Sequence, residues 1–201
     1  MARRWFPSLA VLIALMFLAG SDNSAQVPAD PQSKVEPRSN PGIGQKFLQQ
    51  FVGDWDVVKL LHLRSGDPLR MTGECRQTMM HEGRFLKSEF VFRHNGSQST
   101  GLGMIGFEAE SGIFTSVWTD SRSTRMSLRQ SKEPFDGKEI VLYGRSLNDD
   151  GKGQRRSRTV TQLEEDGQKI VHRAYVTAAD GKEALFMELL MSRKGKTPPA
   201  R

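Results

Sequence analysis

Apolar and polar residues alternate along much of the chain. The segments 84–93, 139–146 and 169–177 alternate β-branched, aromatic and other apolar side chains with polar ones, which is typical of half-buried β-strands. Four Asp-Gly pairs punctuate the later part of the chain, and their glycines lie 14, 16 and 14 residues apart. Asp-Gly supplies the positive φ angles that tight hairpin turns need. The pattern predicts a meander of about ten antiparallel strands.

The predicted strands are near ten residues long, against a typical length of about 5–6. Long strands joined by tight hairpins favour an up-and-down barrel over a sandwich, and closure removes the exposed edges of the meander. Helical periodicity is confined to one short segment before the first strand, in which Phe47, Leu48 and Phe51 share a face. We therefore expect an all-β antiparallel barrel with a short N-terminal helix closing one end.

The first 42 residues are predicted to lie outside the barrel. Residues 1–25 have a basic start, an apolar run and small polar residues after it, which is the layout of a secretory signal peptide. Its uninterrupted apolar part, residues 9–20, is shorter than the roughly 20 residues of a bilayer span, so we expect no stable membrane insertion after cleavage. An uncleaved N-terminal anchor is the alternative. Residues 26–42 carry four prolines and no aromatic residue, which indicates a flexible linker.

The barrel domain is expected over residues 43–195, followed by a disordered tail over 196–201. The leader ends in "LAGS", which resembles the lipobox of bacterial lipoproteins except that Ser21 stands where the lipidated cysteine should be. A hydroxyl cannot form the thioether. The sequence therefore predicts an exported protein, periplasmic or extracellular, that is not a lipoprotein.

Charge and cysteine content indicate which partners are expected and what holds the fold together. Loss of residues 1–25 removes two Arg and one Asp, so the formal net charge falls from +6 to +5. Basic and acidic residues are interspersed, which favours a solvated surface and argues against a nucleic-acid partner. Cys75 is the only cysteine in the sequence, so no intrachain disulfide can form and the core alone must hold the fold.

The stretch "GLGMIGF" at residues 101–107 contains G-x-G-x-x-G, a pattern that can bind a dinucleotide. Such a site needs a helix after the glycines, whereas here a turn and another strand follow. The structural interpretation is that Gly101 and Gly103 point to one face of a strand and Gly106 to the other. Glycines there permit a bulge or the close approach of a large ring.

At "FVGDWDV" the chain resembles the G-x-W motif of lipocalin-like (calycin) barrels, with Gly53 and Trp55 at the start of the first strand. In those barrels an Arg on the last strand lies over the Trp ring, and Arg193 is similarly placed. The resemblance implies that Trp55 and Arg193 close one end of the barrel. Cation–π attraction would contribute about 0.5–2 kcal/mol there.

The rest of the domain resembles a bacterial family of exported domains of unknown function, the one numbered 1579. The resemblance runs from about Phe47 to Lys194 and rests on "FVGDW", "EGRFLKSEF", "GLGMIGFE", "VWTDSRS", "DGKEIVLYG" and "DGKEALFMELLMSRK". The family pattern has Gly-Tyr-Asp where this chain has Gly-Phe-Glu, so the hydroxyl is lost at Phe107. The family implies a lipocalin-like fold and export, and it carries no agreed activity.

Strand alternation assigns side chains to the barrel interior. In 84–93 one face carries Leu86, Phe90 and Phe92, and in 185–192 one face includes Met187 and Leu189. Together with His172, these residues are the predicted ligand-binding set. A barrel of this size can hold a small ligand or fill itself with side chains, so ordinary core packing is the alternative.

Histidine spacing predicts no metal site and no cofactor. None of the four histidines pairs with another at i+2 or i+4. His172 shares a strand face with Ile170, Ala174 and Val176, which fits a haem ligand or a hydrogen-bonded core histidine, and the second is favoured. In "QRRSR", Arg156 and Arg158 share a face. If the two side chains point inward, they would bind an acidic head group. If they point outward, which is the favoured interpretation, they are solvated.

Three functions fit these patterns. The leading hypothesis is a barrel that binds a small, largely apolar ligand. The second is an enzyme, an isomerase or a hydrolase, that uses polar groups at the barrel mouth; it calls for His172 or His81 beside a carboxylate. The third is an envelope interaction module with a filled barrel and no ligand.

Overall fold

The computed structural model describes residues 40–63, 65–147, 154–178 and 180–195. The predicted signal peptide, most of the predicted linker and the predicted tail lie outside these residues. In chain order the described elements are α1 (Ile43–Gln49), β1 (Gly53–Leu61), β2 (Leu69–Met80), β3 (Phe85–His94), β4 (Ser97–Glu108), β5 (Ile113–Asp120), β6 (Ser123–Gln130), β7 (Glu139–Leu147), β8 (Gln154–Glu164), the 3-10 turn η1 (Glu165–Gly167), β9 (Lys169–Thr177) and β10 (Glu183–Arg193).

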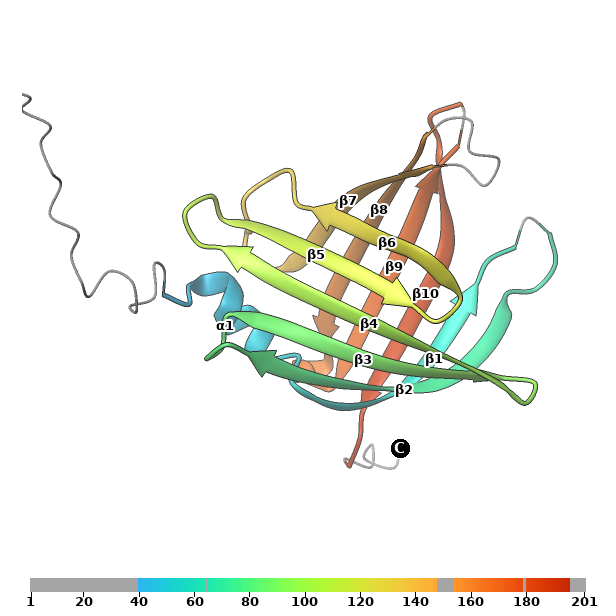
Figure 1. Ribbon diagram of the computed structural model, residues 1–201, viewed down its shortest axis with the longest axis horizontal. Coiled ribbons are helices and arrows are strands. Elements are labelled where there is room, and N and C mark those ends of the chain that lie inside the picture. Colours follow the sequence, from blue (N-terminus) through green and yellow to red (C-terminus); the bar gives the residue numbers. More distant parts are fainter. Residues whose placement is uncertain (1–39, 64, 148–153, 179, 196–201) are drawn as a thin grey trace, which may run out of the picture. The chain divides into compact units, whose positions relative to one another are not determined.

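The ten strands form one closed antiparallel barrel (Figure 1). Each strand pairs with its neighbours in the sequence, and β10 returns to pair with β1. The prediction of an all-β, up-and-down, lipocalin-like barrel is confirmed. Within the described residues, no helix is long and apolar enough to cross a membrane.

Closure of the barrel centres on Trp55 and Arg193, which are direct partners in the β1–β10 register. The Arg193 guanidinium lies 4.2 Å from the centroid of the Trp55 ring, as the resemblance implies. It also donates hydrogen bonds to three backbone carbonyls, at Gly167 (3.0 Å), Val52 (2.7 Å) and Gln50 (2.9 Å). The Arg193 side chain thus connects β10 to β1, to the segment just before β1 and to η1.

The helix α1 lies against the ends of β3 and β4 and covers this end of the barrel (Figure 1). Leu48 is fully buried, and the Gln45 amide donates a buried hydrogen bond of 2.7 Å to the Phe107 carbonyl. Phe107 packs among other phenylalanine rings, with the Phe114 centroid 4.8 Å away. Phe107 is therefore an apolar ring in an apolar cluster.

The glycines of "GLGMIGF" make room for aromatic rings, as the strand pattern predicts. A Cβ atom on Gly101 would lie 2.4 Å from the Trp118 ring, and one on Gly103 would also meet that ring. A Cβ atom on Gly106 would lie 2.7 Å from the ring of Phe85, on the outer face of the barrel. The motif is structural, because a side chain at Gly101 would displace the indole.

The barrel wall is weakest between β6 and β7. Only two residue pairs join these strands, Arg129 with Gly144 and Gln130 with Tyr143, whereas nine join β7 to β8. The outward side chain of Leu128 is 60% exposed. Beyond the two pairs the strands separate, and this region is called the β6–β7 seam below.

Arg193→Ala is expected to lower the free energy of unfolding by roughly 3 kcal/mol, because it removes the stacking on Trp55 and leaves carbonyls without donors. Lys194→Ala is the matched control, since it removes the same charge from an exposed neighbour that forms only surface ion pairs. Its expected cost is below about 1 kcal/mol. Urea unfolding measures both, and equal losses would contradict this role for Arg193.

Candidate functional site

The barrel encloses a cavity of about 420 Å³. The predicted ligand-binding residues all line it, namely Leu86, Phe90, Phe92, His172, Met187 and Leu189. Strands on every side of the lumen contribute to its wall, so residues far apart in the sequence meet there. The lumen is therefore not filled by side chains, and its volume falls within the range of about 300–1,000 Å³ typical of small-molecule pockets.

A bulge in β10 adds one wall residue that simple alternation does not predict. The register with β9 shifts between Leu185 and Met187, and Phe186 consequently lines the cavity. Phe186 is 40% exposed. It therefore lies where the cavity meets solvent.

Lys59 is the most unusual group in the cavity wall. It lies on β1 and is only 4% exposed, and its ammonium nitrogen is 4.5 Å from the centroid of the Phe92 ring. Among the described residues no group forms a hydrogen bond or an ion pair with it. Burial and the nearby charge of Arg122 lower the pKa of Lys59 from 10.5 to about 8, against an opposing effect of Asp120. An unpaired ammonium in an apolar cavity is costly unless a partner arrives.

The sequence reasoning missed Lys59, although the signal was present. Trp55, Val57, Lys59 and Leu61 alternate along β1, and the first two are buried. Strand alternation from Trp55 therefore points Lys59 into the lumen. A lysine at an inward position of a barrel strand is the pattern that would have found it.

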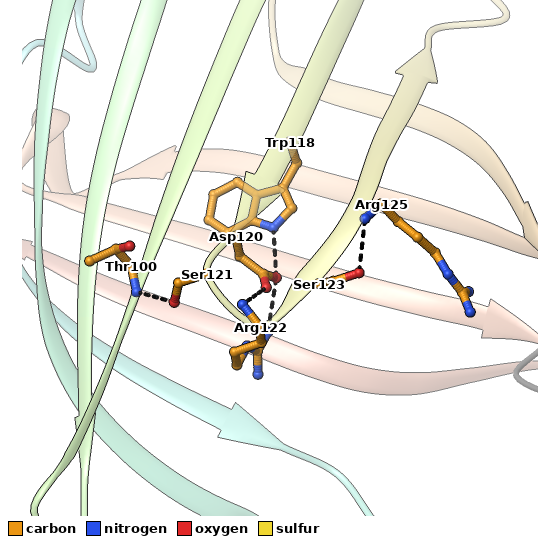
Figure 2. A network of polar contacts seen from close by, with 7 residues as sticks. All are labelled: Thr100, Trp118, Asp120, Ser121, Arg122, Ser123 and Arg125. Carbon is orange, nitrogen blue, oxygen red and sulfur yellow. Dashed lines mark hydrogen bonds and ion pairs between the residues drawn. The ribbon is translucent and has the colours of Figure 1, made fainter.

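The turn between β5 and β6 holds a charged pair at the cavity edge (Figure 2). Asp120 accepts hydrogen bonds from the backbone N–H and guanidinium of Arg122, at 2.9 and 3.1 Å, and from the Trp118 indole at 3.3 Å. Burial alone would raise the pKa of Asp120, but these hydrogen bonds outweigh it and hold the pKa below its ordinary value. Asp120 therefore shapes the turn and stays ionised.

Ser121 fixes the same turn to β4. Its hydroxyl accepts a hydrogen bond of 3.0 Å from the Thr100 N–H (Figure 2). Its own N–H donates to the Thr100 carbonyl at 2.9 Å. These bonds hold Arg122 and Asp120 at the edge of the cavity. The pair is thus part of a hydrogen-bonded rim.

Two further polar atoms in the wall lack partners among the described residues. The Gln77 amide donates to the Ser88 hydroxyl at 2.9 Å, but its buried Oε1 accepts nothing. The buried Nε of Arg129 has no acceptor. Gln77 and Arg129 both line the cavity, although these two atoms are themselves buried within its wall.

His172 lines the cavity beside a hydroxyl, not a carboxylate. Its Nδ1 is 2.8 Å from the Thr161 Oγ1. Burial and the charge of Arg129 lower the pKa of His172 to about 4, so the imidazole is neutral at pH 7. His81 has its ring edge-on to Phe85 on the outer side of the barrel. The geometry expected of the enzyme hypothesis is thus absent at both histidines in the described structure.

Arg156 and Arg158 point away from the lumen, which agrees with the favoured reading of the sequence. Arg158 forms a bidentate contact with Glu183, with distances down to 2.6 Å, and lies 4.4 Å from the Tyr175 ring centroid. Arg156 lines a separate hollow at the seam. Among the described residues, no cluster of three or more His, Cys, Asp or Glu side chains could hold a metal ion.

A family model described as "Protein of unknown function (DUF1579)" matches residues 40–193, which span the helix, the barrel and the cavity. The chain belongs to the DUF1579 family. No curated protein matches this DUF1579 chain.

Among solved structures, the DUF1579 barrel is similar to Rv2717c from M. tuberculosis, with a TM-score of 0.56 and 12% sequence identity. The match covers 78% of this chain and 100% of that chain. At such low identity, the likeness shows the shared barrel fold alone.

Lys59→Met is expected to stabilise the protein at pH 7 by about 1–3 kcal/mol, because it removes a buried unpaired charge. Between pH 8 and 10.5 the unfolded chain binds the Lys59 proton more tightly than the folded protein does, so the free energy of unfolding rises with pH in that window. In Lys59→Met, the free energy of unfolding should lack the part of this rise that comes from Lys59.

Urea unfolding at several pH values measures both effects. Lys87→Met is the matched control, since Lys87 pairs with Glu89 at 3.0 Å and does not line the cavity. A Lys59 variant that unfolds more easily than wild type at pH 7, or keeps the full rise above pH 8, would contradict the account.

Proposed function

We propose that this DUF1579 protein binds a small, largely apolar ligand with one anionic group inside the barrel. The observation that carries the proposal is Lys59, an unpaired ammonium held in an otherwise mainly apolar cavity. The apolar part of the ligand would lie against Leu86, Phe90 and Leu189. Its anionic group would pair with Lys59.

The charge of the cavity wall supports an anion over a neutral or cationic ligand. Among the lining residues three side chains are cationic, Lys59, Arg122 and Arg129, and one is a carboxylate, Asp120. The charge of Asp120 offsets part of the effect of burial on Lys59, but its carboxylate is hydrogen-bonded to Arg122 and forms no ion pair with Lys59. A ligand carboxylate would supply the missing counter-charge, and charge-assisted hydrogen bonds contribute about 1.5–3 kcal/mol.

The size and shape of the wall favour a flexible apolar chain. Aromatic and aliphatic side chains form most of the surface, and Phe186 stands half-exposed at the edge, where a ligand could pass. Pockets of this kind use a large apolar surface for affinity and a few polar groups for orientation. Lys59 is the orienting group here.

The proposal includes export of the protein to the periplasm or the extracellular space, without a lipid anchor. It is supported by the leader-like residues 1–25 and by Ser21 in the lipobox-like position. N-terminal sequencing of the exported protein tests it: a start within residues 22–26 is expected, and a retained residue 1 in the membrane fraction would overturn it.

Binding of dodecanoate and of dodecanol, measured by calorimetry, tests the cavity. Wild type is expected to bind dodecanoate at least tenfold more tightly than the alcohol. Lys59→Met should lose that preference and keep its affinity for dodecanol, because only the charge contact is removed. For wild type, the affinity for dodecanoate should fall as the pH rises above about 8, where Lys59 loses its proton.

Lys87→Met is the control, since it removes the same charge from the outer wall. It should bind both compounds like wild type. If neither compound binds, or if Lys59→Met binds dodecanoate as well as wild type does, the proposal fails.

A further inference from the structure

A second hollow, of about 390 Å³, lies at the β6–β7 seam. Its wall includes Leu128 and Arg129 of β6, Gly144 and Arg145 of β7, and Arg156 of β8. Arg129 also lines the main cavity, so the two spaces meet at this residue. The hollow exists because only two residue pairs hold β6 to β7.

Four cationic side chains line the hollow, Arg129, Lys132, Arg145 and Arg156, and none of the described lining residues is acidic. Arg145 and Arg156 are direct partners in the β7–β8 register. Like charges directly opposite each other on neighbouring strands destabilise a sheet. Neither arginine has an ion-pair partner within the described part of the chain, so nothing there offsets the repulsion.

The two other cations, Lys132 and Arg129, also form no ion pair with a described residue. The Lys132 ammonium lies 4.0 Å from the centroid of the Tyr143 ring, a contact that positions the charge without neutralising it. The buried Nε of Arg129 has no acceptor among the described residues. Gly144 lets Arg129 lie there, because a Cβ atom on Gly144 would be 2.9 Å from the Arg129 Cγ.

The nearby carboxylate is already engaged. Hydrogen bonds from Arg158, which holds the carboxylate in bidentate fashion, lower the pKa of Glu183, and the charge of Lys132 adds a smaller effect. The carboxylate belongs to a hydrogen-bonded pair that bridges β9, with Arg158 on β8 and Glu183 on β10. The excess positive charge at the seam therefore calls for an anion from outside the described chain.

We propose that the hollow at the β6–β7 seam is a binding site for a phosphate group, either free phosphate or a phosphate monoester. Arginine guanidinium groups match phosphate oxygens in bidentate geometry, and Arg145 and Arg156 are cross-strand partners here. A dianion neutralises more of the charge of these four cations than a single carboxylate would. Because Arg129 borders both spaces, the phosphate could also be the head group of an amphiphile whose tail occupies the lumen. This second source of the phosphate group rests on the proposed function.

Calorimetric titration of the purified protein with inorganic phosphate, against chloride at equal ionic strength, tests the site. Saturable binding to wild type is expected. The variant Arg145→Gln/Arg156→Gln should bind phosphate at least tenfold more weakly, and Lys132→Gln should also weaken it. The control Arg70→Gln/Arg76→Gln removes the same charge from exposed positions on β2 and should stay within twofold of wild type.

Dodecyl phosphate distinguishes the two sources. A head-group site predicts that it binds at least tenfold more tightly than either inorganic phosphate or dodecanol, and that Arg145→Gln/Arg156→Gln loses this gain. A site for free phosphate predicts that dodecyl phosphate binds no more tightly than inorganic phosphate. Saturable phosphate binding would support the seam site even if dodecanoate failed to bind in the lumen.

The proposal is overturned if inorganic phosphate shows no saturable binding and dodecyl phosphate shows no preference over dodecanol. It is also overturned if the two double variants weaken phosphate binding equally, because that result would reflect net charge and not the arginine pair.

Discussion

The contact of Arg193 with Trp55 is the interaction on which the rest of the structure depends. A meander of hairpins forms a barrel only if the last strand returns to the first, and that pairing joins residues nearly the whole domain apart in sequence. Arg193 covers the Trp55 ring and satisfies carbonyls on both sides of the junction. With α1 packed on the same end, the closed ring leaves its opposite end and the β6–β7 seam as the places where the wall can open.

Closure of ten strands has a consequence for the interior. Eight strands already give a barrel that side chains can only just fill, so ten leave an open lumen unless very large residues occupy it. This chain places Lys59 in that lumen without an ion-pair partner among the described residues, and the protein therefore carries an electrostatic cost in its empty state. A cost of this kind is typical of sites where function takes precedence over stability. Arg129 connects the cavity and the seam, because it lines both, and its buried Nε has no acceptor among the described residues.

Local sequence patterns predicted the parts of the fold that depend on alternation and turns. The faces of β3 follow directly from the sequence, since Leu86, Phe90 and Phe92 are buried where the pattern puts them. Lys59 could have been found in the same way, but a charged residue in a strand is ordinarily read as solvated. In β6 the pattern misleads, because Met126 and Leu128 are exposed while Arg129 lines the cavity. The bulge that brings Phe186 to the cavity, and the short pairing of β6 with β7, depend on backbone geometry between distant strands and leave no local signal.

The most direct test of the central claim, that the closed barrel holds an unpaired ammonium in its lumen, is NMR titration of the lysine side chains. Without ligand, the Lys59 resonance, assigned by its loss in Lys59→Met, is predicted to titrate near pH 8, while exposed lysines titrate near 10.4. Saturation with dodecanoate should move it upward, since a bound anion favours the charged form. A Lys59 that titrates with the exposed lysines, whether or not dodecanoate is present, would contradict the account.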